Sequence, residues 1–144
     1  MKSHIIVRSC VAGTALLLTV SSCASSAAND ALKKAGVQVT AGGKLPAAFP
    51  PDVPTPSLTL ETGVGTAGLF TLRYTSKDAK ADVAAYRKTL EAAGFAITGD
   101  FDNLAAKANV GFICLKGTMN VDVSAFGPDT PGGGNYLAVI VTTV

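Results

Sequence analysis

Apolar and polar residues alternate in several short segments of this 144-residue chain. The clearest segment is 70–75, in which Phe70, Leu72 and Tyr74 are separated by polar residues. A period of two places alternate side chains on opposite faces of a strand, so this segment predicts a half-buried strand. The same argument predicts strands at 58–61, 95–99, 110–116 and 119–125, with a further short strand open at 37–40. A last strand is predicted at 136–143 from its apolar run.

Helical periodicity is clear in one segment, which follows the strand at 70–75. Its apolar residues recur at spacings of three and four, typical of the buried face of a helix: Ala79, Val83, Tyr86, Leu90 and Ala93. Asp78 is a suitable N-cap before this run, and Gly94 follows it where a left-handed C′ residue is expected. The element order predicts an α+β fold, a single antiparallel sheet of about five to six short strands with one amphipathic helix on one face.

The last predicted strand departs from alternation. Residues 137–141 are all apolar, which is typical of a strand that is covered on both faces. In the predicted strand at 110–116, Phe112 and Cys114 share one face, and Ile113 and Leu115 lie on the opposite face, so both faces are apolar. The sheet face away from the helix is therefore expected to carry an apolar patch around Ile113, Leu115 and Ile140, which either the N-terminal tether or a partner protein could cover.

The helix face has little bulk, since Ala79 and Ala93 flank its larger side chains. Small residues either permit close helix–sheet contact or leave an apolar slot between the two layers, and both interpretations stay open. The residues expected to line such a slot are Val83, Tyr86, Leu90 and Phe112.

The N-terminus has a pattern of its own. Lys2 and Arg8 accompany an apolar run at 11–20, which is shorter than the about 20 residues of a bilayer span and has the length of a signal-peptide core. The run ends in Val20-Ser21-Ser22-Cys23, which resembles the lipobox of bacterial lipoproteins. The resemblance implies cleavage between Ser22 and Cys23, acylation of Cys23, and attachment to the extracytoplasmic face of the cell membrane. A plain secretory signal cut near Ala24 and a buried core helix are the alternatives.

Proline, glycine and serine are frequent after Cys23 and leave no sustained period. The predicted organisation is a removed signal peptide at 1–22, an anchored tether at 23–56 and a small folded domain at 57–144. Within the tether, Phe49 and Val53 are candidate anchors for docking onto the domain. The layout resembles the small lipoproteins exported by actinobacteria, a resemblance that carries no assigned activity.

The charge of the chain excludes some partners. The full sequence has 12 basic and 10 acidic residues, and loss of Lys2 and Arg8 with the signal leaves equal numbers of each. A neutral chain with scattered charges lacks the electrostatic footprint of a nucleic-acid-binding protein. Nucleic acid is therefore not an expected partner, and membrane contact is expected through the lipid on Cys23.

Two short motifs match known binding loops only in part. Residues 63–68 fit the letters of G-x-G-x-x-G, but a strand follows them where a dinucleotide site needs a helix, so a hairpin loop over 62–68 is expected. Residues 100–103 begin like a calcium loop that lacks the glycine and the glutamate required later, so a loop at 100–109 is expected.

Catalytic and metal-binding residues are scarce. The only histidine, His4, lies in the predicted signal peptide, and Cys114 has no disulfide partner once Cys10 is removed and Cys23 is acylated. Glu61 and Glu91 are the glutamates among the acidic residues, and no spacing marks any pair of carboxylates as catalytic. No catalytic residue, metal or cofactor is predicted.

These observations favour a non-enzymatic binding or adaptor module at the cell envelope, with an envelope protein as its partner. The alternative is a small carrier of an apolar ligand or lipid. An enzyme that depends on carboxylates or on Cys114 ranks third.

Overall fold

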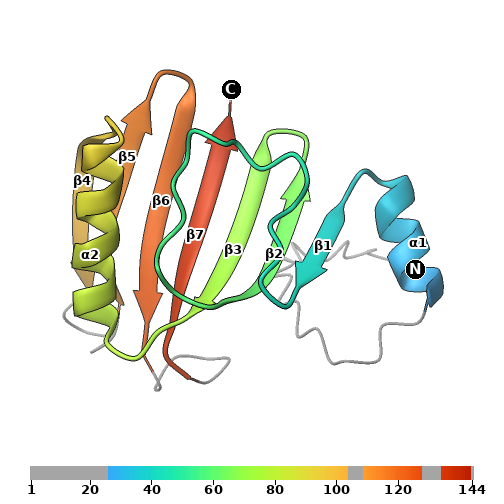
Figure 1. The fold of residues 1–144 in the computed structure, drawn as a ribbon, viewed down its shortest axis with the longest axis horizontal. Coiled ribbons are helices and arrows are strands. Elements are labelled where there is room, and N and C mark those ends of the chain that lie inside the picture. The colour runs from blue at the N-terminus through green and yellow to red at the C-terminus, as the bar shows by residue number, and fades with distance from the viewer. Residues whose placement is uncertain (1–25, 104–108, 128–133, 144) are drawn as a thin grey trace, which may run out of the picture.

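Seven antiparallel strands form one sheet in the computed structural model, which describes residues 26–103, 109–127 and 134–143 (Figure 1). The strand order across the sheet is β1-β2-β3-β7-β6-β5-β4. The strands are β1 (Gln38–Ala41), β2 (Leu60–Thr66), β3 (Leu69–Thr75), β4 (Ala96–Asn103), β5 (Asn109–Lys116), β6 (Met119–Phe126) and β7 (Tyr136–Thr143). The helices are α1 (Ser26–Lys34) and α2 (Ala79–Ala92).

The prediction of five to six strands and one helix was wrong, since the described residues form seven strands and two helices. The additional strand is β1, which pairs with β2 and forms one edge of the sheet. The additional helix is α1, in an alanine-containing stretch without proline that ends at Gly36, whose φ of 72° is the left-handed C′ conformation. Proline and glycine further along indicated a tether, so α1 was not predicted, whereas β1 corresponds to the short strand left open at 37–40.

Helix α2 has the predicted boundaries and caps. The Asp78 side chain accepts a hydrogen bond from the Ala81 amide at 3.1 Å, and Gly94 has a φ of 86°. The Phe95 amide donates to the Leu90 carbonyl at 3.0 Å, which completes the C-terminal cap. The apolar side of the helix therefore ends where its spacing indicated.

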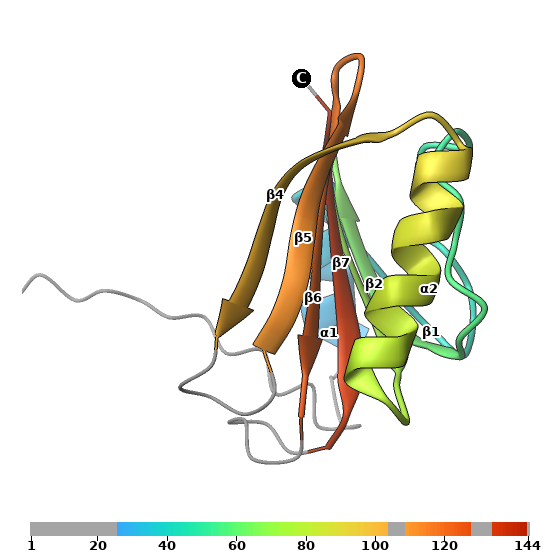
Figure 2. The same cartoon turned by 90° about the vertical axis from the view of Figure 1, so that its left-hand side faces the viewer.

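Helix α2 and a connecting segment, residues 44–59, lie on the same face of the sheet (Figure 2). This segment is called the strap below. It crosses β3 and β7 while α2 lies nearer β5 and β6 (Figure 1). The core between these layers contains the completely buried residues Leu90, Phe112, Cys114, Val121, Val123, Ala125, Leu137, Val139 and Val141.

The strap is anchored by the residues proposed for docking. Val53 is 3% exposed within the core, and the Phe49 ring meets the Phe70 ring edge-on with centroids 5.6 Å apart. The Tyr86 hydroxyl donates to the Pro54 carbonyl at 2.7 Å. The folded unit in the structure therefore includes residues N-terminal to Ser57.

The glycine-rich segment after Leu60 is strand β2, so the predicted loop over 62–68 was wrong for most of its length. A Cβ atom at Gly63 would lie 3.1 Å from the Pro46 ring, and one at Gly65 would lie 2.8 Å from it. Glycine lets the strap lie directly against the strand. The hairpin turn itself falls at Gly68, with a φ of 82°.

Strand β4 is longer than predicted and runs to Asn103, so the loop expected from Asp100 was wrong over its first four residues. Phe101 pairs in register with Gly111 of β5. Because Gly111 has no side chain, the Phe101 ring can lie across it, and a Cβ atom at Gly111 would collide with that ring. This contact extends the strand beyond the point where alternation stops.

Candidate functional site

The sheet face opposite α2 and the strap is crossed by no helix or connection among the described residues (Figures 1 and 2). We call it the open face. Its apolar residues with exposed fractions between 36% and 45% are Val39, Leu69, Phe101, Leu115 and Ile140. Ile113 is half-buried among them.

Strand register brings the three predicted partner-face residues together. Ile113 pairs with Asp122, and Asp122 pairs with Ile140, so the two isoleucines flank one aspartate in a single row. Leu115 lies in the next row, opposite Asn120. Cross-strand neighbours lie about 5 Å apart, so these side chains belong to one surface.

One end of the open face carries a cluster of charged and aromatic side chains. Arg73 forms an ion pair with Glu61 at 2.8 Å and stacks on the Tyr136 ring at 4.1 Å from its centroid. The Phe126 and Tyr136 rings are stacked with centroids 4.7 Å apart. The Thr75 hydroxyl donates to the second Glu61 oxygen at 3.0 Å. The ion pair leaves this cluster without net charge.

Asp122 is the remaining acidic side chain in the centre of this face. It is half-buried and accepts a hydrogen bond from the Ser124 hydroxyl at 3.0 Å. Threonine fills many of the neighbouring positions, among them Thr71 and Thr142. The face is therefore mainly apolar and hydroxyl-bearing, with little charge available to a charged partner.

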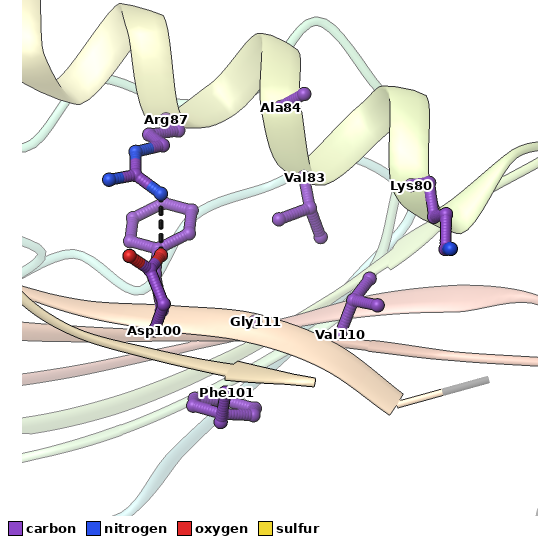
Figure 3. A pocket seen from close by; sticks show the side chains of 9 residues that line it. Lys80, Val83, Ala84, Arg87, Asp100, Phe101, Val110 and Gly111 are labelled. Carbon is purple, nitrogen blue, oxygen red and sulfur yellow. Dashed lines mark hydrogen bonds and ion pairs between the residues drawn. The ribbon is translucent and has the colours of Figure 1, made fainter. Parts of the chain in front are cut away.

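A groove of about 500 Å³ lies between α2 and strands β4 and β5. Lys80, Val83, Ala84 and Arg87 project from the helix above it, whereas Phe101 lies on the opposite side of the two strands (Figure 3). The groove therefore belongs to the covered side of the sheet, and its mouth carries two cationic residues.

Arg87 spans this groove. Its guanidinium pairs with Glu91 at 3.2 Å and with Asp100 at 2.5 Å, and it lies 5.8 Å from the centroid of the Phe112 ring. The hydrogen bonds to Glu91 and then to Asp100 raise the pKa of Arg87 above its ordinary value. Glu91 and Asp100 are both paired with Arg87. Among the described residues that line the groove, no unpaired carboxylate is therefore left to act as a general acid or base.

The four residues predicted for an apolar slot, Val83, Tyr86, Leu90 and Phe112, are together in the core. Val83 and Phe112 form part of the groove wall. Tyr86 and Leu90 are 2% and 0% exposed and fill the space between helix and sheet. The slot is thus occupied by side chains along most of its length.

The remaining chemical candidates are held in structural roles. Cys114 is fully buried, and burial followed by the charge of Glu91 raises the pKa of its thiol to about 11. A thiol in that state is a poor nucleophile at neutral pH. Within the described ranges no three metal-ligating side chains come together.

Ser22 and Cys23, the predicted cleavage and lipidation residues, lie outside the described residues. Among the helices that are described, none has the length and apolar character to cross a membrane. Comparison of the chain with protein-family models, curated proteins and solved structures gives no match.

Several residues of the open face were missed at the sequence level. Leu69 and Phe101 were overlooked. Leu69 carried a signal, because it directly precedes Phe70 and the period of two therefore places it on the opposite face of the strand. The stacking of Arg73 on Tyr136 had no local signal, because β3 and β7 are neighbours only in the folded sheet.

Proposed function

We propose that this protein is a lipid-anchored binding module without enzymatic activity, which recruits a protein partner at the cell envelope through its open face. The observation that carries the proposal is the exposed apolar surface around Ile113, Leu115 and Ile140. Large apolar side chains that lie together on a sheet without cover mark an interaction surface.

The lipobox resemblance supports the anchored location. Only Ala24 and Ser25 separate Cys23 from α1, and the strap that was expected to act as a spacer packs on the sheet. Two or three acyl chains on Cys23 would hold the domain stably, since each buried CH₂ contributes about 0.8 kcal/mol. The binding face would then be presented within a short distance of the membrane.

The size of the open face suits a protein partner. Seven strands spaced about 4.8 Å apart, with residues about 3.3 Å apart along each, give a face of roughly 700 Å². A stable interface buries about 800 Å² on each partner. Because the Arg73–Glu61 pair is satisfied internally and Asp122 lies in the centre of the face, we infer a partner surface that is flat and mainly apolar, with one cationic or hydrogen-bond-donating group opposite Asp122.

The test is native mass spectrometry of the protein extracted from its own membranes. Two variants place a charge on the open face, Ile140→Lys and Leu115→Lys. Ala92→Lys is the matched control, because Ala92 is exposed at the end of α2 on the other side of the sheet. Near-ultraviolet and far-ultraviolet circular dichroism establish that each variant is folded.

The expected result is a second polypeptide of constant mass, present with the wild-type protein and with Ala92→Lys and absent with both face variants. A monomer, a dimer of the chain itself, or a complex with lipid alone would contradict the adaptor function. The acyl mass on Cys23 is measured in the same spectrum. Its absence would refute the anchor while the partner is still tested.

A further inference from the structure

Helix α1 lies apart from the two layers of the fold. It is found beyond β1, at the edge of the sheet farthest from α2 (Figure 1). Every residue from Ala28 to Gly36 is exposed, including Leu32 at 37%. An isolated helix of 9 residues is marginal in water, because most helical stability in proteins comes from the packing of an apolar face. Among the described residues nothing buries α1, so its apolar side is without a partner surface.

The residues of α1 divide into an apolar and a polar side. The apolar residues recur at spacings of three and four and so share one side of the helix: Ala28, Ala31, Leu32 and Ala35. The polar side carries Lys33 and Lys34 against a single acid, Asp30. Neither lysine forms an ion pair among the described residues. An apolar side combined with cationic groups is typical of helices that lie in the surface of an anionic bilayer.

The proposed lipid anchor lies immediately before this helix. Only Ala24 and Ser25 separate Cys23 from the start of α1 at Ser26. A chain extends at most about 3.6 Å per residue, so Ser26 lies within about 11 Å of Cys23. Amphipathic helices at a membrane are buried about 5–10 Å into the boundary between headgroups and acyl chains. An acyl group on Cys23 would therefore bring α1 to the bilayer surface.

The charge beside the anchor favours this contact. The whole chain is neutral once the predicted signal peptide is removed, but residues 24–44 contain Lys33, Lys34 and Lys44 and a single acid, Asp30. The potential of an anionic membrane falls off within a Debye length, which is about 8 Å at physiological ionic strength. The local positive charge, and not the net charge of the protein, therefore decides whether this segment is attracted.

We propose that α1 lies on the surface of an anionic bilayer, with its apolar side in the interface and Lys33 and Lys34 at the lipid headgroups. The inference rests on the anchor of the proposed function and adds a second membrane contact to it. Residues 35–37 connect α1 to β1, and the Val37 amide donates to the Leu32 carbonyl at 2.9 Å. Contact through α1 would therefore hold the β1 edge of the sheet toward the membrane.

The test is hydrogen exchange of the α1 backbone amides in the full acylated chain on lipid vesicles. Two vesicle compositions are compared, phosphatidylcholine alone and phosphatidylcholine mixed with phosphatidylglycerol. The acyl chains insert into both, so a difference between them reports the surface contact and not the anchor. Mass spectrometry of the same sample establishes whether Cys23 is acylated.

Three variants accompany the wild type. Leu32→Gln removes the largest apolar side chain of α1, and Lys33→Gln removes one of its cations. Lys88→Gln is the matched control, because Lys88 is an exposed lysine of α2. Glutamine has a helix propensity similar to those of leucine and lysine, so the α1 variants report the contact and not the formation of the helix.

The expected result is that the α1 amides of the wild type exchange more slowly on the anionic vesicles than on phosphatidylcholine alone. Lys33→Gln should lower this protection about fivefold, because one lysine near an anionic surface contributes about 1 kcal/mol. Leu32→Gln should lower it at least as much, and Lys88→Gln should leave it unchanged.

Three outcomes would overturn the inference. Equal exchange on both vesicle compositions would exclude the anionic surface. Protection that persists in Lys33→Gln and Leu32→Gln would mean that α1 packs on the chain itself or on a second copy. A chain without acyl groups on Cys23 would refute the anchor, and the helix contact with it. The acyl mass thus distinguishes failure of the proposed anchor from failure of the contact made by α1.

Discussion

The two faces of the sheet are made of similar residues and have different surroundings. In β7, Val139 and Val141 are completely buried beneath α2 and the strap, whereas Ile140 between them is 37% exposed. A strand that is apolar on both sides is expected where both faces are covered. Here the described residues cover one face, and the exposed apolar side chains of the other face are the basis of the proposed binding role.

Substitutions at adjacent positions of β7 give the largest contrast between the faces. Val139→Asp places a carboxylate in the core, where it has neither water nor a cation, and should cost more than about 4 kcal/mol. That is a large part of the about 5–15 kcal/mol by which native domains are stable. Ile140→Lys instead extends into solvent opposite Asp122 and should change the free energy of unfolding by less than about 1 kcal/mol.

Urea denaturation followed by circular dichroism measures both free energies. If Ile140→Lys unfolds the protein as Val139→Asp does, Ile140 belongs to a core and the open face is not a free surface. If Val139→Asp costs as little as Ile140→Lys, the covered face is less tightly packed than the burial of Val139 indicates.

Local sequence patterns predicted the covered face well. The helix boundaries follow from the Asp78 cap and Gly94, and alternation identified β3, β5 and β6, because these signals lie within a few residues of one another. The shared face of Ile113 and Leu115 follows from the period of two alone. Ile140 was added from the unbroken apolar run of its own strand.

Features that depend on distant segments could not be predicted in this way. Gly63 and Gly65 resembled a flexible loop, and only the strap lying against them explains why glycine is needed in a strand. The cluster of Arg73 with Tyr136 depends on the pairing of β3 with β7. Tyr74 fitted the alternating pattern, but nothing in the sequence indicates that its hydroxyl is left without a partner.

Two glycines of neighbouring strands test the contact between Phe101 and Gly111 on the open face. A side chain at Gly111 would collide with the Phe101 ring and with the backbone oxygen of Val123. Gly111→Ala should therefore cost about 1–3 kcal/mol, since the backbone cannot move freely. A Cβ atom at Gly99 meets nothing within 4 Å, so Gly99→Ala should be close to neutral.

Thermal unfolding of the two glycine variants provides the comparison. Equal melting temperatures would mean that the Phe101 ring does not lie across Gly111. The open face would then lose one of its apolar residues.

Alkaline pH tests how dry the covered face is. The thiol pKa of Cys114 is raised to about 11 from an ordinary value of 9.0, so between these limits the unfolded chain loses a proton that the folded chain keeps. The unfolded state then binds fewer protons, and stability should fall with rising pH by about 1.4 kcal/mol per unit for this group. Below about pH 9 the thiol should contribute no pH dependence.

The measurement is urea denaturation of wild type and Cys114→Ala between pH 8 and pH 11. The variant should lose stability less steeply over this interval, although its absolute stability is lower because of the cavity it creates. Parallel curves would show that the thiol is hydrated and that the core beneath α2 is open to water.

The smallest expected effects distinguish two tyrosines beneath the strap. Tyr86→Phe removes the hydrogen bond to the Pro54 carbonyl and should cost about 1 kcal/mol. Tyr74→Phe removes a buried hydroxyl that has no hydrogen-bond partner among the described residues, so stability should be unchanged or rise slightly. Denaturation midpoints of the two variants, measured side by side, resolve the difference. A loss in Tyr74→Phe equal to that in Tyr86→Phe would mean that the Tyr74 hydroxyl is hydrogen-bonded in the folded protein.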